Sequence, residues 1–289
     1  MARPRQNPSL RSPLPCRRVT VTTPDGLAIA AQEWGTAAGP EIIFIHGFSQ
    51  SHLCWLHQVT GPLARDFRLV TYDIRGHGGS DKPPEAAYYR QAAGWANELE
   101  AVIEQFGMTR PVVVAWSYAG RIALDYLLVF GSARLAGLVF VGATSCTDPA
   151  CFGPAVPILG RMGSDDPATS ILATREFLQV STARPLPCHA FEFMLGYNML
   201  VPARIRANLS GRPAPYEAVL TSLDRPLLAI HGEEDVVNLP AMACHTIAMV
   251  PRARGLFYDG VGHLPFWEAP GRFDADIAEF VLSVQDTAV

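Results

Sequence analysis

The segment PVVVAWSYAG at residues 111–120 places Ser117 where an apolar, β-branched run gives way to small residues. Such a run is typical of a strand and the residues after it favour a helix, so we expect Ser117 at the bend between them. A sharp bend needs small neighbours, and Ala115, Ala119 and Gly120 meet that need. The N-terminus of the following helix directs its free N–H groups toward the serine oxygen, where they would stabilise a developing anion.

Two other residues suited to nucleophilic catalysis follow later strands. The segment HGEEDVVNLP places Asp235 after the apolar run at 226–230, and YDGVGHLPFWEAP places His263 after the run at 254–258. Because parallel strands deliver their carboxyl ends to one edge of a sheet, we expect Ser117, Asp235 and His263 to converge there. A serine hydroxyl is a poor nucleophile by itself and needs a base within hydrogen-bond reach to take its proton.

A fourth segment, IFIHGFSQSHLCW, follows the strand expected at 41–45. Its His46-Gly47 turn can present the backbone N–H of Phe48 toward the same sheet edge. We interpret His46 as a brace of this turn rather than as a proton-transfer group.

The elements that must position these residues are short apolar strands alternating with helical patterns. A hairpin is expected at 19–22 and 27–34, because Pro24, Asp25 and Gly26 supply turn chemistry between two period-2 segments. The runs typical of buried parallel strands are 41–47, 67–73, 111–117, 135–142, 225–232 and 253–260, and helical patterns cover 89–106, 118–130 and 273–284. This alternation predicts an α/β fold with a mostly parallel central sheet flanked by helices.

One interval interrupts the alternation. Residues 143–222 separate two expected strands and contain nine prolines together with amphipathic stretches. A structureless loop of this length is improbable in a compact domain, so we expect a helical insertion that stands over the sheet edge as a cap. The core domain then comprises residues 19–142 and 223–289, and residues 1–18 are expected to form a disordered arm.

Composition limits the functional classes. The 289 residues are 49% hydrophobic and 17% charged, which is enough apolar material for a full core, and the net charge of −4 offers no long-range attraction to nucleic acid. No secretory signal or membrane span is recognisable, so a cytoplasmic location is expected. The six cysteines show no CxxC spacing, so metal binding is not expected. Reduced thiols are the favoured interpretation, and pairing of Cys146 with Cys151 stays open.

Taken together, the motifs resemble those of the α/β-hydrolase superfamily, in its capped, esterase-like branch. The resemblance covers roughly residues 19–285, and the order Ser, Asp, His is the order of that family. Its five signatures are His46-Gly47-Phe48, DIRGHGGSD at 73–81, AWSYAG at 115–120, HGEED at 231–235 and GVGH at 260–263. The departure is alanine in place of glycine at 115 and 119, which the size requirement tolerates.

The resemblance implies a serine hydrolase without metal or cofactor. Ser117 would be the nucleophile, His263 the general base and acid, and Asp235 the group that orients the imidazole, while the backbone N–H groups of Phe48 and Tyr118 would bind the oxyanion. Glu233, Glu234 and Asp148 are less favoured alternatives to Asp235, because the family spacing G-x-x-D selects Asp235. Arg75 and His77 match a loop whose role in the family is largely structural.

The expected substrate is a small molecule with a carboxylic ester, small to medium in size and mainly apolar. Six aromatic or aliphatic side chains are candidates for an apolar pocket, although core packing is the favoured interpretation for any one of them: Trp55, Trp116, Phe177, Phe191, Met194 and Leu195. Three alternatives stay open. They are hydrolysis of a carbon–carbon bond or a lactone, acyl transfer by the same triad, and a ligand receptor that retains the triad. Oligomeric state is not indicated by the sequence.

Overall fold

An eight-stranded, mostly parallel sheet forms the centre of the protein, in a computed structural model that describes residues 17–212 and 215–285. The strand order is β1-β2-β4-β3-β5-β6-β7-β8. The strands are β1 (Arg17–Thr22), β2 (Ala28–Gly35), β3 (Glu41–Ile45), β4 (Arg68–Tyr72), β5 (Val112–Trp116), β6 (Gly137–Val141), β7 (Leu227–Gly232) and β8 (Ala253–Tyr258). Only the pairings of β2 with β1 and with β4 are antiparallel among these strands. The predicted α/β fold class is confirmed.

The strands lie where the apolar runs predict them, with one difference at the N-terminus. Arg17 and Arg18 already belong to β1, where they pair with Glu33 and Gln32, although the arm was expected to extend to residue 18. The cross-strand ion pair between Arg17 Nε and Glu33 (3.0 Å) accounts for the earlier start of the strand. The rest of the expected arm, residues 1–16, lies outside the described residues.

Alternate residues of each central strand face opposite layers. On β3, Ile43 and Ile45 belong to one apolar core, and Ile42 and Phe44 belong to the other. The helices of the first layer include α4 (Ala92–Gln105), α5 (Ala119–Phe130) and α11 (Pro240–Met249), and those of the second include α1 (Leu56–Thr60), α12 (Pro265–Glu268) and α13 (Pro270–Gln285). Burial on both faces explains why these strands read as continuous apolar runs.

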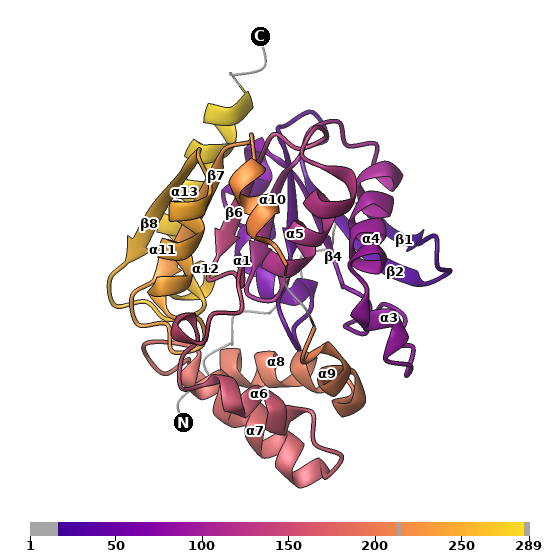
Figure 1. The fold of residues 1–289 in the computed structure, drawn as a ribbon, viewed down its shortest axis with the longest axis vertical. Helices are drawn as coiled ribbons and strands as arrows, with labels where there is room; N and C mark the ends of the chain where they lie inside the picture. Colours follow the sequence, from indigo (N-terminus) through magenta and orange to yellow (C-terminus); the bar gives the residue numbers. More distant parts are fainter. Residues whose placement is uncertain (1–16, 213–214, 286–289) are drawn as a thin grey trace, which may run out of the picture.

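The long interval after β6 contains five helices, of which four lie together at one end of the sheet (Figure 1). The five are α6 (Val156–Met162), α7 (Pro167–Val180), α8 (Cys188–Met199), α9 (Ala203–Leu209) and α10 (Glu217–Ser222). The first four pack on one another, whereas α10 packs on α5 and α11 beside the sheet. The remaining short helices are α2 (Leu63–Asp66) and α3 (Ala87–Arg90), with 3-10 turns at His52–Trp55 and Pro149–Cys151.

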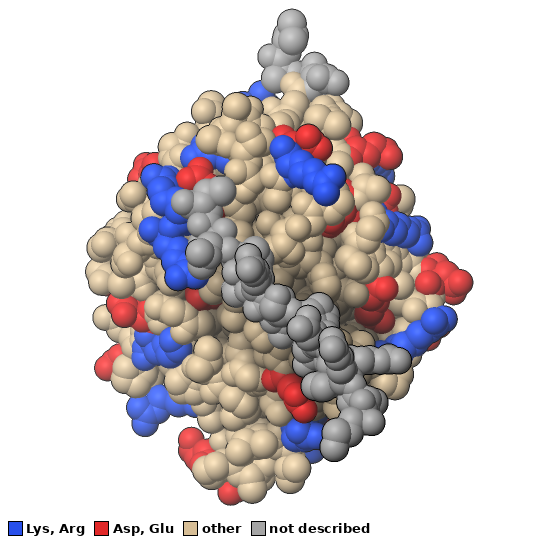
Figure 2. Space-filling model, turned by 180° about the vertical axis from the view of Figure 1, so that it is seen from behind, with Lys and Arg blue, Asp and Glu red and all other residues tan. Residues whose placement is uncertain are grey.

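The surface charges and the cysteines of the described residues do not point to a particular function. On the face shown in Figure 2, acidic and basic side chains of the described residues are interspersed rather than gathered by sign. Within the described ranges, no helix is long and apolar enough to cross a membrane. Cys146 and Cys151 are both free thiols, and the Cys146 Sγ lies 3.5 Å from the Met242 Sδ.

Candidate active site

Ser117 occupies a strained bend between β5 and α5. Its φ of 55° lies in the left-handed region that side-chain-bearing residues rarely adopt. The bend is held on both sides, since the Ser117 N–H donates to Val141 O (3.0 Å) and its carbonyl accepts from the N–H groups of Gly120 (3.0 Å) and Thr144 (2.9 Å). A Cβ on Gly120 would lie 2.8 Å from both Ala143 Cβ and Thr144 O, so this position of the helix must be glycine for the bend to close.

Asp235 and His263 form a buried hydrogen-bonded pair. His263 Nδ1 donates to Asp235 Oδ2 at 2.7 Å, and both side chains are inaccessible to solvent. The other carboxylate oxygen accepts the N–H groups of Val237 (2.8 Å) and Asn238 (3.1 Å). Burial by itself would raise the pKa of Asp235, but the neighbouring His263 and His231 lower it to about 2. The carboxylate is therefore ionised at every pH at which the protein is expected to work.

His231 is a partner of Asp235 that the sequence analysis did not find. Its Nε2 lies 3.3 Å from Asp235 Oδ2 and donates to Asn238 O at 2.8 Å. The motif HGEED carries the signal, because residues 231 and 235 bracket the tight turn that ends β7. Sequence alone could not show that the ring turns back over this turn rather than out to solvent.

Gly142 brings the histidine–aspartate pair next to Ser117. Because Ser117 N–H bonds to Val141 O, Gly142 stands beside the serine at the ends of neighbouring parallel strands. A Cβ on Gly142 would lie 3.1 Å from Asp235 Oδ2 and 3.2 Å from His263 Nδ1. The three residues thus meet at one sheet edge. His263 Nε2 is buried without a hydrogen-bond partner among the described residues, so no hydrogen bond to the Ser117 hydroxyl is formed in this structure.

The loop that carries His263 is fixed through its backbone. Trp116 Nε1 donates to His263 O (2.9 Å), and the His263 N–H donates to Ser181 O (2.8 Å). The Trp116 side chain is buried in the core, and the centre of its ring lies 5.5 Å from the centre of the His263 imidazole. Trp116 therefore positions the histidine loop from beneath.

Glu268 fixes the same loop from its other side. Its carboxylate accepts the N–H groups of Gly262 (3.0 Å), Leu264 (3.2 Å) and Ala183 (2.8 Å). Burial raises the pKa of Glu268, while these N–H groups favour its ionised form. No signal in the sequence marks this residue, because its partners are backbone N–H groups, which impose no residue type, and one of them, that of Ala183, lies 85 positions away.

Two histidines hold the loop that carries Phe48. His77 Nε2 accepts the N–H of Ser49 (3.1 Å), which keeps Ser49 in the left-handed region at a φ of 62°. His46 Nε2 accepts the Ile74 N–H (3.1 Å), so its protonated Nδ1 donates to Gly47 O (2.9 Å). Burial lowers the pKa of His46 to about 4 and that of His77 to about 3, so both are neutral acceptors.

This loop lies against the serine. A Cβ on Gly47 would stand 3.0 Å from Ser117 Cβ, so only glycine lets the loop approach this closely. The N–H groups of Phe48 and Tyr118 have no acceptor among the described residues. Two backbone donors without partners beside one hydroxyl can stabilise an oxygen that gains negative charge.

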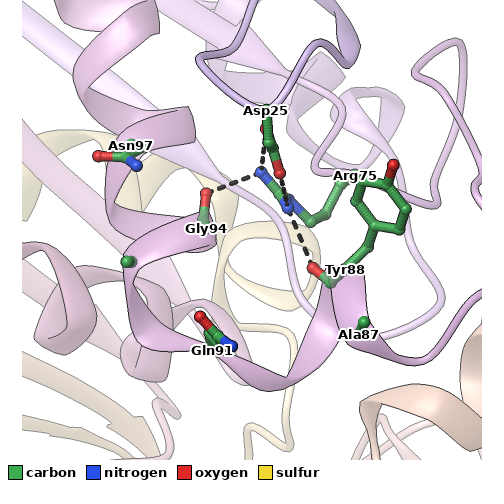
Figure 3. Close-up of a pocket in the computed structure, with 8 residues that line it drawn as sticks. Asp25, Arg75, Ala87, Tyr88, Gln91, Gly94 and Asn97 are labelled. Carbon is green, nitrogen blue, oxygen red and sulfur yellow. Dashed lines mark hydrogen bonds and ion pairs between the residues drawn. The ribbon is translucent and has the colours of Figure 1, made fainter.

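Arg75 lines a different hollow, of about 310 Å³, together with Asp25, Tyr88 and Gly94 (Figure 3). Its Nη1 donates to Asp25 (2.8 Å) and to the Tyr88 carbonyl (3.0 Å), its Nη2 donates to Asp25 (3.3 Å) and to the Gly94 carbonyl (2.7 Å), and its Nε donates to Glu98 (2.8 Å). All five of its N–H directions are used, so Arg75 has none left for a ligand. The residue braces the loop at 73–81 against the turn between β1 and β2 and against α3 and α4.

Ser117 opens into a cavity of about 370 Å³ between the sheet edge and the four packed helices. From the core it is lined by Phe48, Ser117, Tyr118, Arg121, Thr144, Val237 and Asn238, and from the insertion by Phe152, Val156, Pro157, Leu159, Gly160, Leu209, Ser210 and Gly211. Most of this lining is apolar.

The six side chains proposed for the pocket from sequence lie elsewhere. Trp55 and Trp116 are fully buried beneath the site, where Trp55 packs on Phe266 at 4.3 Å. None of the four from the insertion lines this cavity: Phe177 and Met194 are buried in the core, and Phe191 and Leu195 are partly buried and pack against it. These side chains attach α7 and α8 to the core.

The alternative acids lie away from His263. Glu233 and Glu234 are exposed on the turn after β7. Asp148 is exposed and accepts the Ala150 N–H (2.9 Å), which caps a short 3-10 turn. In the described ranges, no three side chains of His, Cys, Asp or Glu are grouped so that they could hold a metal ion.

Comparison with known proteins assigns the chain to a family. Residues 42–275 match the model of the alpha/beta hydrolase family. The structure resembles that of a protein assigned as an aryl esterase from Burkholderia cenocepacia, at 33% identity and a TM-score of 0.90 over 93% of this chain and 100% of the other. It also resembles the esterase RhEst1 from Rhodococcus sp., at 32% identity and a TM-score of 0.87 over 92% of this chain and 99% of the other. A non-heme haloperoxidase from Rhodococcus erythropolis is 24% identical over 91% of this chain and 99% of its own length. The chain therefore belongs to the alpha/beta hydrolase family, and its esterase relatives support a hydrolase.

Proposed function

We propose that the protein is a serine hydrolase that cleaves carboxylic esters of small to medium, mainly apolar molecules. The observation that carries this proposal is the buried 2.7 Å hydrogen bond between His263 and Asp235, next to a serine in a left-handed bend at the mouth of an apolar cavity. A buried, ionised Asp235 that accepts a hydrogen bond from His263 Nδ1 leaves His263 Nε2 unprotonated and able to act as a base. Serine at the bend favours acyl chemistry over alkyl transfer.

The first half of the reaction forms an acyl-enzyme. Ser117 Oγ attacks the ester carbonyl carbon while His263 Nε2 takes the hydroxyl proton, and the carbonyl electron pair moves to oxygen. That oxyanion accepts from the N–H groups of Phe48 and Tyr118, each donor contributing about 3–4 kcal/mol in comparable sites. The carbon–oxygen bond to the alcohol then breaks, and His263 returns its proton to the leaving alkoxide.

Water completes the cycle. His263 Nε2 takes a proton from water as its oxygen attacks the acyl carbon, and the same nitrogen protonates Ser117 Oγ when the acid leaves. Asp235 stabilises the imidazolium in both halves without accepting its proton. The missing hydrogen bond between Ser117 and His263 Nε2 is compatible with these roles, because such contacts often tighten only when substrate is bound.

The insertion at 143–222 supplies the cover of the site in this proposal. Helices α6 and α9 contribute Val156, Leu159 and Leu209 to the cavity wall, so they would hold the apolar part of an ester. A volume of about 370 Å³ favours acyl and alcohol groups of modest size.

A fluorophosphonate probe tests the nucleophile. The wild type should gain one adduct, on Ser117, and Ser117→Ala should gain none, while the control Ser132→Ala should label like the wild type. Intact-mass and peptide mass spectrometry measure the result. Labelling at another residue, or labelling of Ser117→Ala, contradicts the assignment.

A substrate panel tests the reaction. Ester hydrolysis predicts turnover of p-nitrophenyl esters within the usual enzymatic range, about 1–1000 s⁻¹, abolished in Ser117→Ala. Thioesters, lactones and vinylogous diketones on the same panel would identify another acyl or carbon–carbon bond hydrolase. Binding of esters without turnover would point to a receptor.

A further inference from the structure

A threonine lies in the cavity wall beside the nucleophile. Thr144 lines the same cavity as Ser117 and is 8% exposed. Its backbone N–H donates to Ser117 O at 2.9 Å, so the two residues are direct neighbours at the edge of the sheet. A substrate whose ester carbonyl reaches Ser117 therefore also comes close to Thr144.

The side chain of Asn238 fixes the role of the Thr144 hydroxyl. Asn238 Nδ2 donates to Gly142 O (2.7 Å) and to Thr144 Oγ1 (3.1 Å). The carbonyl of Gly142 can only accept, so this contact identifies the amide nitrogen of Asn238, and an amide nitrogen can only donate. Thr144 Oγ1 is therefore the acceptor in its contact with Asn238.

Asn238 is itself held by the loop that carries the aspartate. Its N–H donates to Asp235 Oδ1 (3.1 Å), and its carbonyl accepts from His231 Nε2 (2.8 Å). Asn238 is 2% exposed, so its amide cannot turn away without leaving buried polar groups unpaired. These contacts keep the amide nitrogen directed at Thr144 Oγ1.

The proton of the Thr144 hydroxyl is left to donate elsewhere. A hydroxyl has one proton to give as well as lone pairs that accept. Within residues 17–212 and 215–285, the hydroxyl bonds to Asn238 alone, and Thr144 and Asn238 both line the cavity. Removing a polar group from water without a partner is costly, so a donor in this mostly apolar wall favours an acceptor that arrives with the substrate.

We propose that Thr144 donates a hydrogen bond to the substrate and makes the site selective for esters that carry a second acceptor oxygen close to the ester group. The inference rests on the proposed function and narrows its substrate class. An ester of the same shape with CH₂ in place of that oxygen would leave the donor unpaired, and a site built to form a hydrogen bond discriminates against such an analogue.

Two pairs of esters test this selectivity, one with the second oxygen in the acyl part and one with it in the alcohol part. The acyl pair is p-nitrophenyl methoxyacetate and p-nitrophenyl butanoate, and the alcohol pair is 2-methoxyethyl acetate and butyl acetate. Within each pair one oxygen replaces one CH₂ group. For each enzyme the ratio of kcat/KM within a pair is measured, so that differences in chemical reactivity cancel when variants are compared.

Three variants give the comparison. Thr144→Val keeps the shape of the side chain without its hydroxyl, and it should lower the ratio of ether to hydrocarbon ester in at least one pair by about 3- to 10-fold, the effect of one neutral hydrogen bond. The pair that responds identifies the part of the substrate that carries the oxygen. Thr144→Ser retains the hydroxyl and should keep the wild-type ratios within about 2-fold. Thr221→Val, which removes an exposed hydroxyl on α10, is the matched control and should leave both ratios unchanged.

The outcomes separate this inference from the proposed function. If the wild type hydrolyses none of the four esters, the proposed function fails. If it hydrolyses them and Thr144→Val leaves both ratios unchanged, or if Thr221→Val lowers them equally, the hydrogen bond from Thr144 is refuted.

If Thr144→Val does not fold, competitive inhibition of the wild type decides. The matching amides are N-phenyl-2-methoxyacetamide with N-phenylbutanamide, and N-(2-methoxyethyl)acetamide with N-butylacetamide. A wall without a free donor should bind the hydrocarbon member of each pair about 4-fold more tightly, because that member buries one more CH₂ group. Equal or tighter binding of the ether member in one pair supports the proposal, and tighter binding of the hydrocarbon member in both pairs overturns it.

Discussion

Replacing Gly142 with alanine tests whether the geometry of the Asp235–His263 pair controls turnover. The residue has a φ of 48°, and its added Cβ would lie 3.1 Å from Asp235 Oδ2 and 3.2 Å from His263 Nδ1. Both distances are shorter than ordinary contact, which begins at 3.4 Å, so one or both partners must move by a few tenths of an ångström. Neither side chain is exposed to solvent, and His263 is tied through its backbone, so the movement falls on the hydrogen bond between them.

The size of the effect follows from these displacements. A misplacement of 1 Å in an active site costs about 100-fold in rate, so a shift of a few tenths of an ångström should lower kcat by roughly 3- to 10-fold. KM should change little, because the new methyl group does not line the cavity. The left-handed backbone adds a stability cost of about 1–2 kcal/mol that is independent of catalysis.

A matched control separates the two effects. Gly107 also has a left-handed φ, of 58°, but a Cβ there would meet nothing within 4 Å. Gly107→Ala should therefore lose a similar free energy of unfolding and keep the wild-type kcat. The assay is steady-state hydrolysis of a p-nitrophenyl ester together with urea unfolding of both variants. If Gly142→Ala keeps the wild-type kcat while it loses stability like the control, the reasoning that links this pair to catalysis is refuted.

Three further substitutions test other parts of the site. Burial raises the pKa of Asp274 to about 6, although the hydrogen bond from Gln58 opposes this shift. Between about pH 4 and 6 the folded chain therefore holds a proton on Asp274 that the unfolded chain has released. The stability that this proton contributes is present below about pH 4 and is lost as the pH rises through 6. Asp274→Asn should therefore stabilise the protein more at pH 8 than at pH 4 in urea unfolding, and an equal effect at both pH values would contradict this. His77→Leu leaves the buried Ser49 N–H without an acceptor, which should cost about 1–3 kcal/mol of stability and lower kcat; unchanged kcat in the folded variant would separate this loop from the oxyanion site. Glu268→Gln should lower kcat more than it raises KM, because it weakens the anchors of the histidine loop, and a change confined to KM in the same kinetic assay would argue against that role.

The strand pattern was predictable because burial on both faces of a parallel sheet leaves a strong local signal. The run EIIFI at 41–45 and the run VVVAW at 112–116 are apolar throughout, and each became a central strand. The position of α10 was not predictable in the same way. Its residues fall within the expected insertion, but the helix packs on α5 beside the sheet, and this depends on contacts between segments far apart in the chain.

Bends and close approaches were also partly visible in the sequence. The small residue at 120 indicated the turn at Ser117, and the structure gives the reason in the 2.8 Å that would separate its Cβ from Ala143. The partners that fix the histidine loop were invisible. Trp116 and Glu268 act on the backbone of that loop, and a side chain that bonds to backbone imposes no residue type on its partner.

The sequence by itself determined the fold class, the order of the strands along the chain and the set of loops that reach the carboxyl edge, because each depends on local patterning and on the direction of parallel strands. Only the tertiary structure decided which side chains line the cavity beside Ser117. Phe177 of α7 and Met194 of α8 looked suited to a pocket, yet they are buried in the core, and residues of α6 and α9 form part of the wall. Hydrophobic burial is non-directional, so an apolar side chain fits a core and a pocket equally well until neighbouring helices fix its place.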